Sequence, residues 1–431
     1  MKNALKTLAV ILILTICLSC SDSDKLPLLK PTPVPETSTP EPEQIKSTHE
    51  DFGEENGFVY KDNGDGTCTI TTYKGEQAGD LVIPREINGL AVTIIGDSYF
   101  AGIMGRSAFT DCTGFTGNLI IPDSVTRIEL CAFSGCSGLT GTLVIPNSVT
   151  HIGMSAFDGC SGFTGTVVIP NNVTTIEPGV FTRCSGIASI DISAQNPYYA
   201  TLDGILFNKD KSELIQAPGG MQVENYVVPS SVQTISSYAF QDCDGLTGSI
   251  TIPETVTRIG AYAFSDCNDL VSIEVSELNQ NYSSLDGMLL AGKSELFCVP
   301  AGMQRENYVI PSSIVRIFNF AFSNCSGFTG NLTIPDSVTY LGDGAFYGCS
   351  GLTSITIGSH VTDMGYNSVG CFIFANCSNL TQVDFLTNAP EGDVFENMFD
   401  DCADDFKIIY DPLKSGWSTP LWRGYPCYPK A

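Results

Sequence analysis

The sequence predicts a β-rich solenoid, a fold in which short repeated coils stack on one another. The first observation is a repeat: the pair Phe-x-x-Cys occurs ten times in the 431 residues, and five of the nine steps between copies are 24 residues. The second observation is an alternating apolar triplet that ends in Ile-Pro in the full units. The third is unit size, because one unit of this length cannot bury a core alone and must stack on its neighbours.

Each coil has three parts, which the unit from Leu143 to Phe163 illustrates. The triplet that ends at Pro146 is rich in β-branched residues and alternates, so we expect one short strand per coil of about 24 residues. The proline ends the strand because it has no N–H to donate. A second segment, Ser148 to Ile152, follows, and then the Phe-x-x-Cys part, Ala156 to Phe163.

The N-terminus predicts export. Residues 1–19 hold two lysines and an apolar stretch that is too short to span a bilayer, which favours a signal peptide. Ser19-Cys20 resembles a lipobox, which implies a lipid on Cys20, although Cys17 stands where lipoboxes favour an aliphatic residue. The acidic residues after Cys20 resemble a signal for the outer face of the outer membrane. Ordinary secretion is the alternative.

The rest of the chain divides into four parts. Residues 20–57 are rich in Pro, Thr and Glu and predict a disordered tether. Residues 58–95 predict an N-terminal cap with a hairpin that turns at Asp65-Gly66. The solenoid spans 96–402, with extra coils near 193–228 and 276–310 that contain hairpins. Residues 403–431, with Trp417, Trp422 and Tyr425, predict a C-terminal cap.

Several of these stretches resemble one known family. "IPDSVTRIELCAFSGCSGL", "LDGILF" and "GWSTPLWRGYPCYP" look like the BspA-like bacterial leucine-rich-repeat proteins, over about residues 58–428. The resemblance implies a right-handed leucine-rich-repeat solenoid on the cell surface or secreted. It also implies a role in adhesion to host proteins or other bacteria, and it supplies no catalytic motif.

Composition and motifs argue against several functions. With 21 basic and 47 acidic residues the net charge is −26, so we expect no nucleic acid and no basic membrane-binding patch. We find no spacing of Cys and His that suits zinc, and no catalytic motif. The Asp65-Gly66 stretch lacks the acidic ends of a calcium loop. His151 and His360 take repeat positions held elsewhere by polar residues, and we interpret them as surface variation. We therefore expect no metal, no cofactor and no enzyme.

The repeated cysteines predict a structural ladder of reduced, buried thiols. Neighbouring ladder side chains point the same way, which does not suit a disulfide. The ladder consists of Cys112, Cys136, Cys160, Cys184, Cys243, Cys267, Cys325, Cys349, Cys377 and Cys402. Five cysteines lie off the ladder and are the better disulfide candidates: Cys68, Cys131, Cys298, Cys371 and Cys427.

The middle residue of each strand triplet should face outward. In the first four triplets this residue is aliphatic, which predicts an exposed apolar stripe that is a candidate binding face. The candidate residues are Val82, Ile120, Val144 and Val168, joined by Tyr198 and Tyr199 as possible contacts to protein or glycan. Tyr226 and Tyr308 precede further triplets and should line the core.

These observations predict a monomeric, non-catalytic, adhesin-like protein that is lipid-anchored at the outer membrane. The partner is an extracellular protein bound by the solenoid face. The alternatives are capture of a polysaccharide, a scaffold role in the cell envelope and, remotely, an enzyme.

Overall fold

The structure is a computed structural model that describes residues 52–96, 107–365, 372–390 and 397–431. One compact unit, residues 53–98 and 106–431, contains nearly all of them. The expected signal peptide, Cys20 and most of the tether lie outside the described residues. Among the described residues, no helix has the length and hydrophobicity that a bilayer crossing requires.

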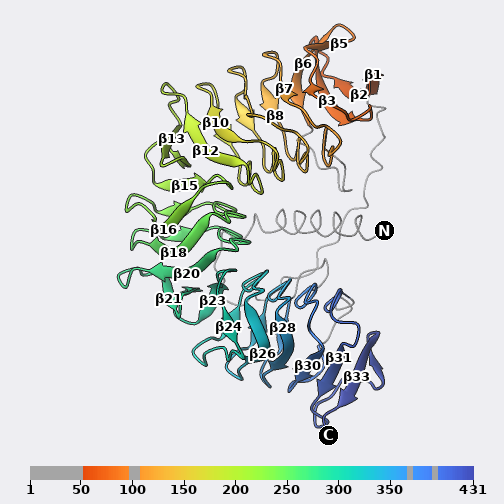
Figure 1. The fold of residues 1–431 in the computed structure, drawn as a ribbon, viewed down its shortest axis with the longest axis vertical. Coiled ribbons are helices and arrows are strands. Elements are labelled where there is room, and N and C mark those ends of the chain that lie inside the picture. The colour runs from red at the N-terminus through yellow and green to blue at the C-terminus, as the bar shows by residue number, and fades with distance from the viewer. Residues whose placement is uncertain (1–51, 97–106, 366–371, 391–396) are drawn as a thin grey trace, which may run out of the picture. The chain divides into compact units, whose positions relative to one another are not determined.

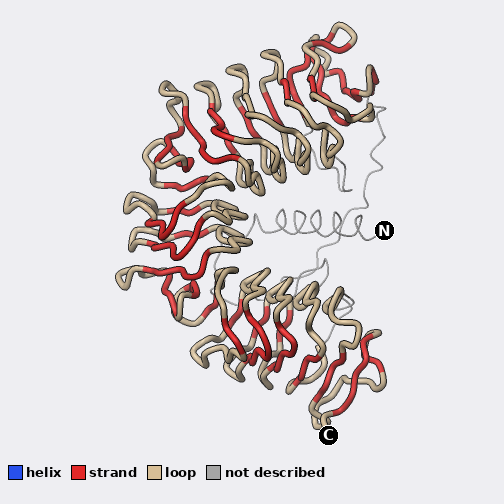
Figure 2. Tube along the Cα trace, viewed as in Figure 1, coloured by secondary structure: helices blue, strands red, loops and turns tan. Residues whose placement is uncertain are grey.

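The unit is a β-solenoid in which successive coils lie side by side in chain order (Figure 1). Each regular coil contributes one strand to each of two parallel ladders, and turns make up the rest of the coil (Figure 2). The structure thus adds a second strand to the one expected: segments such as Ser148 to Ile152 end in a two-residue strand.

The first ladder carries the strands of the apolar triplets. Leu81 pairs with Leu119 and Val167 with Ile190, so the same face of each strand points inward. This ladder comprises β4 (Leu81–Val82), β7 (Leu119–Ile120), β10 (Gly165–Ile169), β12 (Ile187–Ile192), β16 (Val223–Val227), β18 (Leu246–Ile252), β20 (Leu270–Val275), β24 (Arg305–Glu306), β26 (Phe328–Ile334), β28 (Leu352–Ile357), β30 (Gln382–Phe385) and β31 (Lys407–Tyr410).

The second ladder carries shorter strands. Ile128 pairs in register with Ile152, which pairs with Ile176. This ladder comprises β6 (Leu90–Ile95), β8 (Arg127–Ile128), β9 (His151–Ile152), β11 (Thr175–Ile176), β17 (Thr234–Ile235), β19 (Arg258–Ile259), β25 (Arg316–Ile317), β27 (Tyr340–Leu341) and β29 (Asp363–Met364). Threonine hydroxyls reinforce it: Thr150 donates to the carbonyl of Thr126, and Thr174 to that of Thr150.

The repeated phenylalanines form a buried stack that runs from coil to coil. The ring centroids of Phe133 and Phe157 are 5.4 Å apart and those of Phe157 and Phe181 are 5.9 Å apart, with nearly parallel planes. The residue just before each ladder cysteine has a left-handed backbone, as at Gly159 (φ 71°) and Asp242 (φ 55°). This conformation explains why Gly, Asn and Asp are frequent there.

The two extra coils are three-stranded antiparallel inserts. They consist of β13 (Tyr199–Leu202), β14 (Ile205–Asn208) and β15 (Glu213–Gln216), and of β21 (Tyr282–Leu285), β22 (Met288–Ala291) and β23 (Glu295–Cys298). The middle strand of each insert separates two buried clusters. Leu206 packs into the cluster on the N-terminal side, whereas Ile205 and Phe207 pack into the next cluster. Leu289 likewise belongs to one cluster and Leu290 to the next.

Caps close both ends. At the N-terminal end β1 (Phe52–Glu55), β2 (Phe58–Asp62) and β3 (Thr67–Tyr73) precede β5 (Glu86–Ile87), and the β2–β3 hairpin turns where expected. Asp65 accepts hydrogen bonds from the N–H and hydroxyl of Thr67, which makes it a turn residue. At the other end β32 (Leu421–Trp422) pairs with β33 (Tyr425–Pro429), and Trp417 packs on Tyr410.

Candidate functional site

The first four outward positions of the triplet ladder form an apolar column. The side chains of Val82, Ile120, Val144 and Val168 are 47–65% exposed. Val82 pairs with Ile120 and Val144 with Val168, so these side chains stand on neighbouring rungs. Neighbouring strands are about 4.8 Å apart, so the column offers a continuous aliphatic surface on a rigid sheet.

The column contains two further aliphatic residues beyond the four predicted from the sequence. Val227 is 64% exposed and pairs with Thr251, and Val309 is 60% exposed and pairs with Thr333. Both lie in the middle of a triplet that ends in proline, directly after Tyr226 and Tyr308. The same motif that identified Val144 could therefore have found them.

The column falls into three blocks with the same order of side chains. Each block begins with an exposed aliphatic residue and ends with an acid, and after the last acid the column continues to Ile409 and Tyr428 in the C-terminal cap. Along the chain the blocks are Val82, Ile120, Val144, Val168 and Asp191; then Val227, Thr251 and Glu274; then Val309, Thr333, Thr356 and Asp384. The first block carries the longest aliphatic run.

The two candidate tyrosines have different environments, which corrects one prediction. Tyr198 is half exposed, as a contact residue requires. Tyr199 is only 8% exposed, and its hydroxyl accepts a hydrogen bond from the N–H of Ile176 and donates to the carbonyl of Thr174. Tyr199 therefore joins the insert to the preceding coil. Tyr226 is buried and Tyr308 half-buried, as expected.

The ladder cysteines have no disulfide among the described residues, and their thiols bridge coils. The Sγ of Cys160 donates to the carbonyl of Phe133 (3.1 Å) and that of Cys184 to the carbonyl of Phe157 (3.1 Å). Burial raises the pKa of both thiols well above the ordinary value. A protonated buried thiol is a poor nucleophile, which agrees with a structural ladder.

The cysteines off the ladder are also free thiols wherever the structure describes them. Cys68 and Cys427 are buried near opposite ends of the solenoid, and Cys131 and Cys298 are half-buried. Burial raises the pKa of Cys131 to about 12. Cys371 lies outside the described residues.

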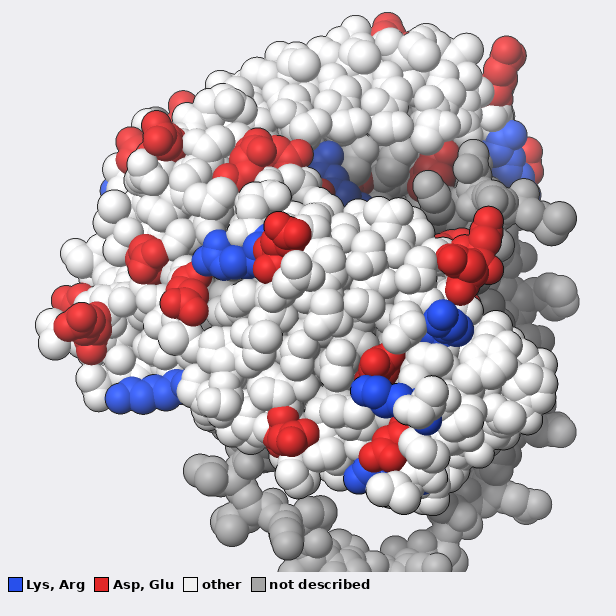
Figure 3. Space-filling view, turned by 60° about the horizontal axis from the view of Figure 1, so that its bottom comes forward, with Lys and Arg blue, Asp and Glu red and all other residues white. Residues whose placement is uncertain are grey.

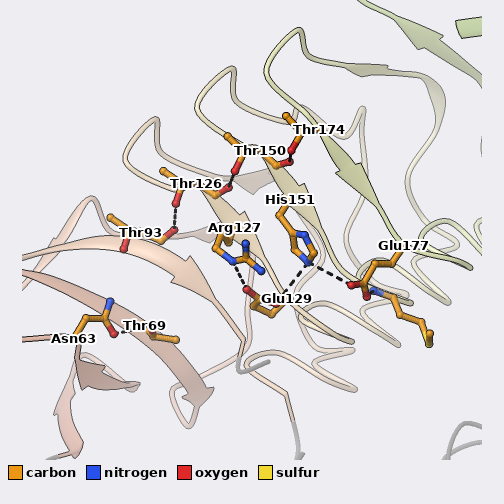
Figure 4. Close-up of polar contacts among 11 residues, drawn as sticks. Asn63, Thr69, Thr93, Thr126, Arg127, Glu129, Thr150, His151, Thr174 and Glu177 are labelled. Carbon is orange, nitrogen blue, oxygen red and sulfur yellow. Dashed lines mark hydrogen bonds and ion pairs between the residues drawn. The ribbon is translucent and has the colours of Figure 1, made fainter. Parts of the chain in front are cut away.

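One polar cluster lies on the second ladder near the N-terminal end (Figure 4). The Nε2 atom of His151 is 3.7 Å from a carboxylate oxygen of Glu129 and 3.7 Å from one of Glu177. Arg127 donates to Glu129 at 2.5 Å, and Glu177 accepts the N–H of Met154. The side chain of His151 is 12% exposed, so it is largely enclosed and not the surface variation expected; His360 is exposed.

On the face that Figure 3 draws, basic and acidic side chains are interspersed between wide uncharged areas. Within the described ranges, no group of three or more His, Cys, Asp or Glu side chains is placed to hold a metal ion. The main feature of the candidate site is thus the exposed aliphatic column on a rigid sheet.

The sequence matches the BspA type leucine rich repeat region in six copies, over residues 92–214, 219–296 and 301–410. No protein with a curated description shows significant similarity.

Solved structures with a similar fold include a leucine rich cell surface protein from Faecalibacterium prausnitzii, at 26% identity and a TM-score of 0.43, over 83% of this chain and 88% of that one. The pneumococcal vaccine antigen PcpA matches at 18% identity and a TM-score of 0.37, over 84% and 94%. A leucine-rich repeat protein from Bacteroides ovatus matches at 21% identity and a TM-score of 0.30, over 84% and 99%.

Proposed function

This chain belongs to the BspA type leucine rich repeat family, and we propose that it is a non-catalytic, adhesin-like surface protein that binds an extracellular protein. The observation that carries this proposal is the exposed aliphatic column from Val82 to Val168. Soluble proteins rarely leave such a contiguous apolar stripe open to water unless it meets a partner. The acidic residues that end each block form a polar border, as protein interfaces have.

The test replaces three aliphatic residues of the column by aspartate: Ile120→Asp, Val144→Asp and Val168→Asp in one variant. The side chains point outward, so the fold should persist, while a charge on each rung prevents burial of the stripe. The measurement is binding to an array of purified extracellular-matrix proteins. We expect wild type to bind and the variant to lose at least about tenfold in affinity, or about 1.4 kcal/mol.

The matched control places the same charges on the same column where it is already polar, as Thr251→Asp, Thr333→Asp and Thr356→Asp. This control should bind as wild type does. Equal loss in both variants would mean that added negative charge, not the apolar stripe, governs binding. A wild-type protein that binds nothing on the array would favour the envelope-scaffold alternative.

For attachment to the cell we propose a lipid on Cys20, with residues 20–57 as the tether of a monomer. The support is the Ser19-Cys20 sequence behind an apolar stretch. Metabolic labelling with a radioactive fatty acid should label wild type and leave a Cys20→Ser variant unlabelled. An unlabelled wild-type protein in the culture medium would establish secretion instead.

A further inference from the structure

A hollow of about 320 Å³ opens where the first insert meets the preceding coil. Tyr198 and Tyr199 line it from the start of the insert, and Glu213 lines it from β15. Thr174 closes the N-terminal side and Ser236 the C-terminal side. Ligand pockets in proteins begin at about 300 Å³, so the hollow has room for one small molecule.

The second insert is built on the same plan and serves as an internal comparison. The hydroxyl of Tyr282 accepts the N–H of Ile259 at 2.9 Å, just as Tyr199 accepts that of Ile176 at 2.8 Å. Two equivalent buried asparagines, Asn196 and Asn279, bond the carbonyls of the coil before each insert. The two inserts therefore share the same contacts to the backbone of the preceding coil. The differences between them lie in their side chains.

In the second insert aromatic rings take two positions that a serine and an isoleucine hold in the first. Phe318 stands at the position of Ser236, and Phe297 at that of Ile215. The ring of Phe297 packs edge-on against Tyr282 (6.2 Å between centroids) and against Phe318 (5.9 Å). Since the second insert folds with these rings in place, the fold itself does not require a hollow.

The glutamates of the two inserts also differ in their partners. Glu295 lies 3.7 Å from Arg316. In the first insert Thr234 replaces the arginine, and the Oε1 of Glu213 accepts the hydroxyl of Ser236 at 2.6 Å. The Oε2 of Glu213 accepts no hydrogen bond from any described residue. The hollow thus holds a carboxylate with one oxygen that can still accept hydrogen bonds from a ligand.

An aromatic ring stands at the mouth of the hollow. Tyr198 is half exposed, and its hydroxyl makes no hydrogen bond within the described ranges. Its backbone N–H donates to the Oδ1 of Asn196 at 2.8 Å, which fixes the residue although its side chain is open to solvent. The second insert has Asn281 at this position, so the exposed ring occurs in the insert that has the hollow and the carboxylate with an unused oxygen.

We propose that this hollow binds one neutral pyranose ring of a glycan. A pyranose has an apolar C–H face, which suits the ring of Tyr198, and hydroxyls at its rim, which suit the free oxygen of Glu213. The hydroxyl of Thr174 donates to Thr150 and keeps lone pairs for a further sugar hydroxyl. The negative charge of Glu213 repels acidic sugars, so we expect the hollow to bind neutral sugars more tightly. This site is separate from the aliphatic column.

The first experiment is saturation-transfer NMR on the full chain with three probes: methyl β-glucopyranoside, methyl β-galactopyranoside and the acidic methyl β-glucuronide. At least one neutral glycoside should show transfer, and the glucuronide should show less. Absence of transfer to both neutral probes, or equal transfer to the glucuronide, overturns the proposal. An array of mucin-type glycans and bacterial polysaccharides then separates host from bacterial sources.

The second experiment copies the second insert into the first, as Tyr198→Asn and, separately, Ser236→Phe. Each should reduce affinity for the bound glycoside by about tenfold or more, equal to about 1.4 kcal/mol. Tyr428→Ala, which removes an exposed tyrosine elsewhere, is the matched control and should bind as wild type. Unchanged binding in Tyr198→Asn, an exposed position that the fold tolerates, overturns the site even where Ser236→Phe fails to fold.

The aspartate variant of the aliphatic column should retain glycoside binding. Loss of protein binding without loss of glycoside binding, or the reverse, separates failure of this proposal from failure of the proposed function.

Discussion

At the scale of single residues, charge is buried beside the phenylalanine stack. Arg183 stands at a position that favours Gly, Asn or Asp because its φ is 57°. Its Nε donates to Oδ1 of Asp158 at 2.9 Å, and a second nitrogen donates to Oδ2, which makes a two-pronged ion pair. Asp242 stands at the same position of the next regular coil, and its Oδ2 is buried with no hydrogen-bond partner among the described residues.

The buried carboxyl of Asp242 predicts a pH dependence of stability. Burial, and then repulsion by Asp266, raise its pKa to about 8, against about 4 in the unfolded chain. The folded state therefore holds a proton that the unfolded state releases. This contribution to stability is complete below about pH 4 and is lost as the pH rises to about 8.

We expect an Asp242→Asn variant to gain free energy of unfolding relative to wild type as the pH rises across this window. Asparagine tolerates the left-handed backbone and occupies the same position at Asn324 and Asn376. Urea unfolding at pH 4.5, 6 and 8 measures the difference. A difference in the free energy of unfolding between the two proteins that stays the same at all three pH values would contradict the prediction. The control is Asp401→Asn, at an exposed residue that holds the same repeat position.

Single residues were also where the sequence predicted least. Alternation within a triplet predicts that Val144 faces outward, because the apolar residues on either side of it are expected to face the core. Tyr198 and Tyr199 follow Asn196-Pro197 in an irregular turn, where no period tells which tyrosine is buried. The enclosure of His151 depends on Glu129 and Glu177, each about one coil away. The residue types found at the position of His151 in other repeats do not reveal these contacts between coils.

At the scale of the coil, sequence and structure agree because one rule applies many times. Where a Phe-x-x-Cys unit follows a regular coil, its ring stacks on the preceding phenylalanine and its thiol donates to the carbonyl of that phenylalanine. Directly after the two inserts, the thiols of Cys243 and Cys325 donate to the carbonyls of Pro218 and Val299 instead. The 24-residue step repeats these contacts without adjustment. The inserts follow a different rule, since their middle strands face two clusters, and alternation alone does not say which cluster receives which residue.

The stack predicts a large effect of one truncation. Phe157→Ala removes a fully buried ring between Phe133 and Phe181, and leaves a cavity that the neighbouring coils cannot fill. We expect a loss of about 3–5 kcal/mol in the free energy of unfolding. Urea unfolding followed by circular dichroism measures it. Phe52→Ala, at an exposed ring of β1, should stay within about 0.5 kcal/mol.

At the scale of the whole unit, the two inserts divide the core into three successive buried clusters. Repeat proteins gain stability from contacts between neighbouring units, so damage at one end need not reach the other. The two tryptophans, Trp417 and Trp422, both belong to the C-terminal cluster. Their fluorescence therefore reports on that cluster, whereas circular dichroism reports on all coils.

This division predicts that two probes of one unfolding experiment will disagree. In Phe157→Ala, which damages the N-terminal cluster, the circular dichroism midpoint in urea should fall more than the tryptophan fluorescence midpoint. Equal shifts would mean that the three clusters unfold as one cooperative unit. A Phe399→Ala variant, in the C-terminal cluster, reverses the expected order and is the matched control.

The last strand has a consequence for crowded surfaces. β33 contains Pro426 and Pro429, which have no N–H, and β32 folds back along it. An open parallel sheet would otherwise offer its final strand as a template for a second molecule. The two missing N–H donors, together with the pairing of β32 with Tyr425 and Pro426, interrupt that template. We expect copies held at high density to stay separate and not to polymerise end to end, which would leave the outward face of each solenoid free for the partner proposed above.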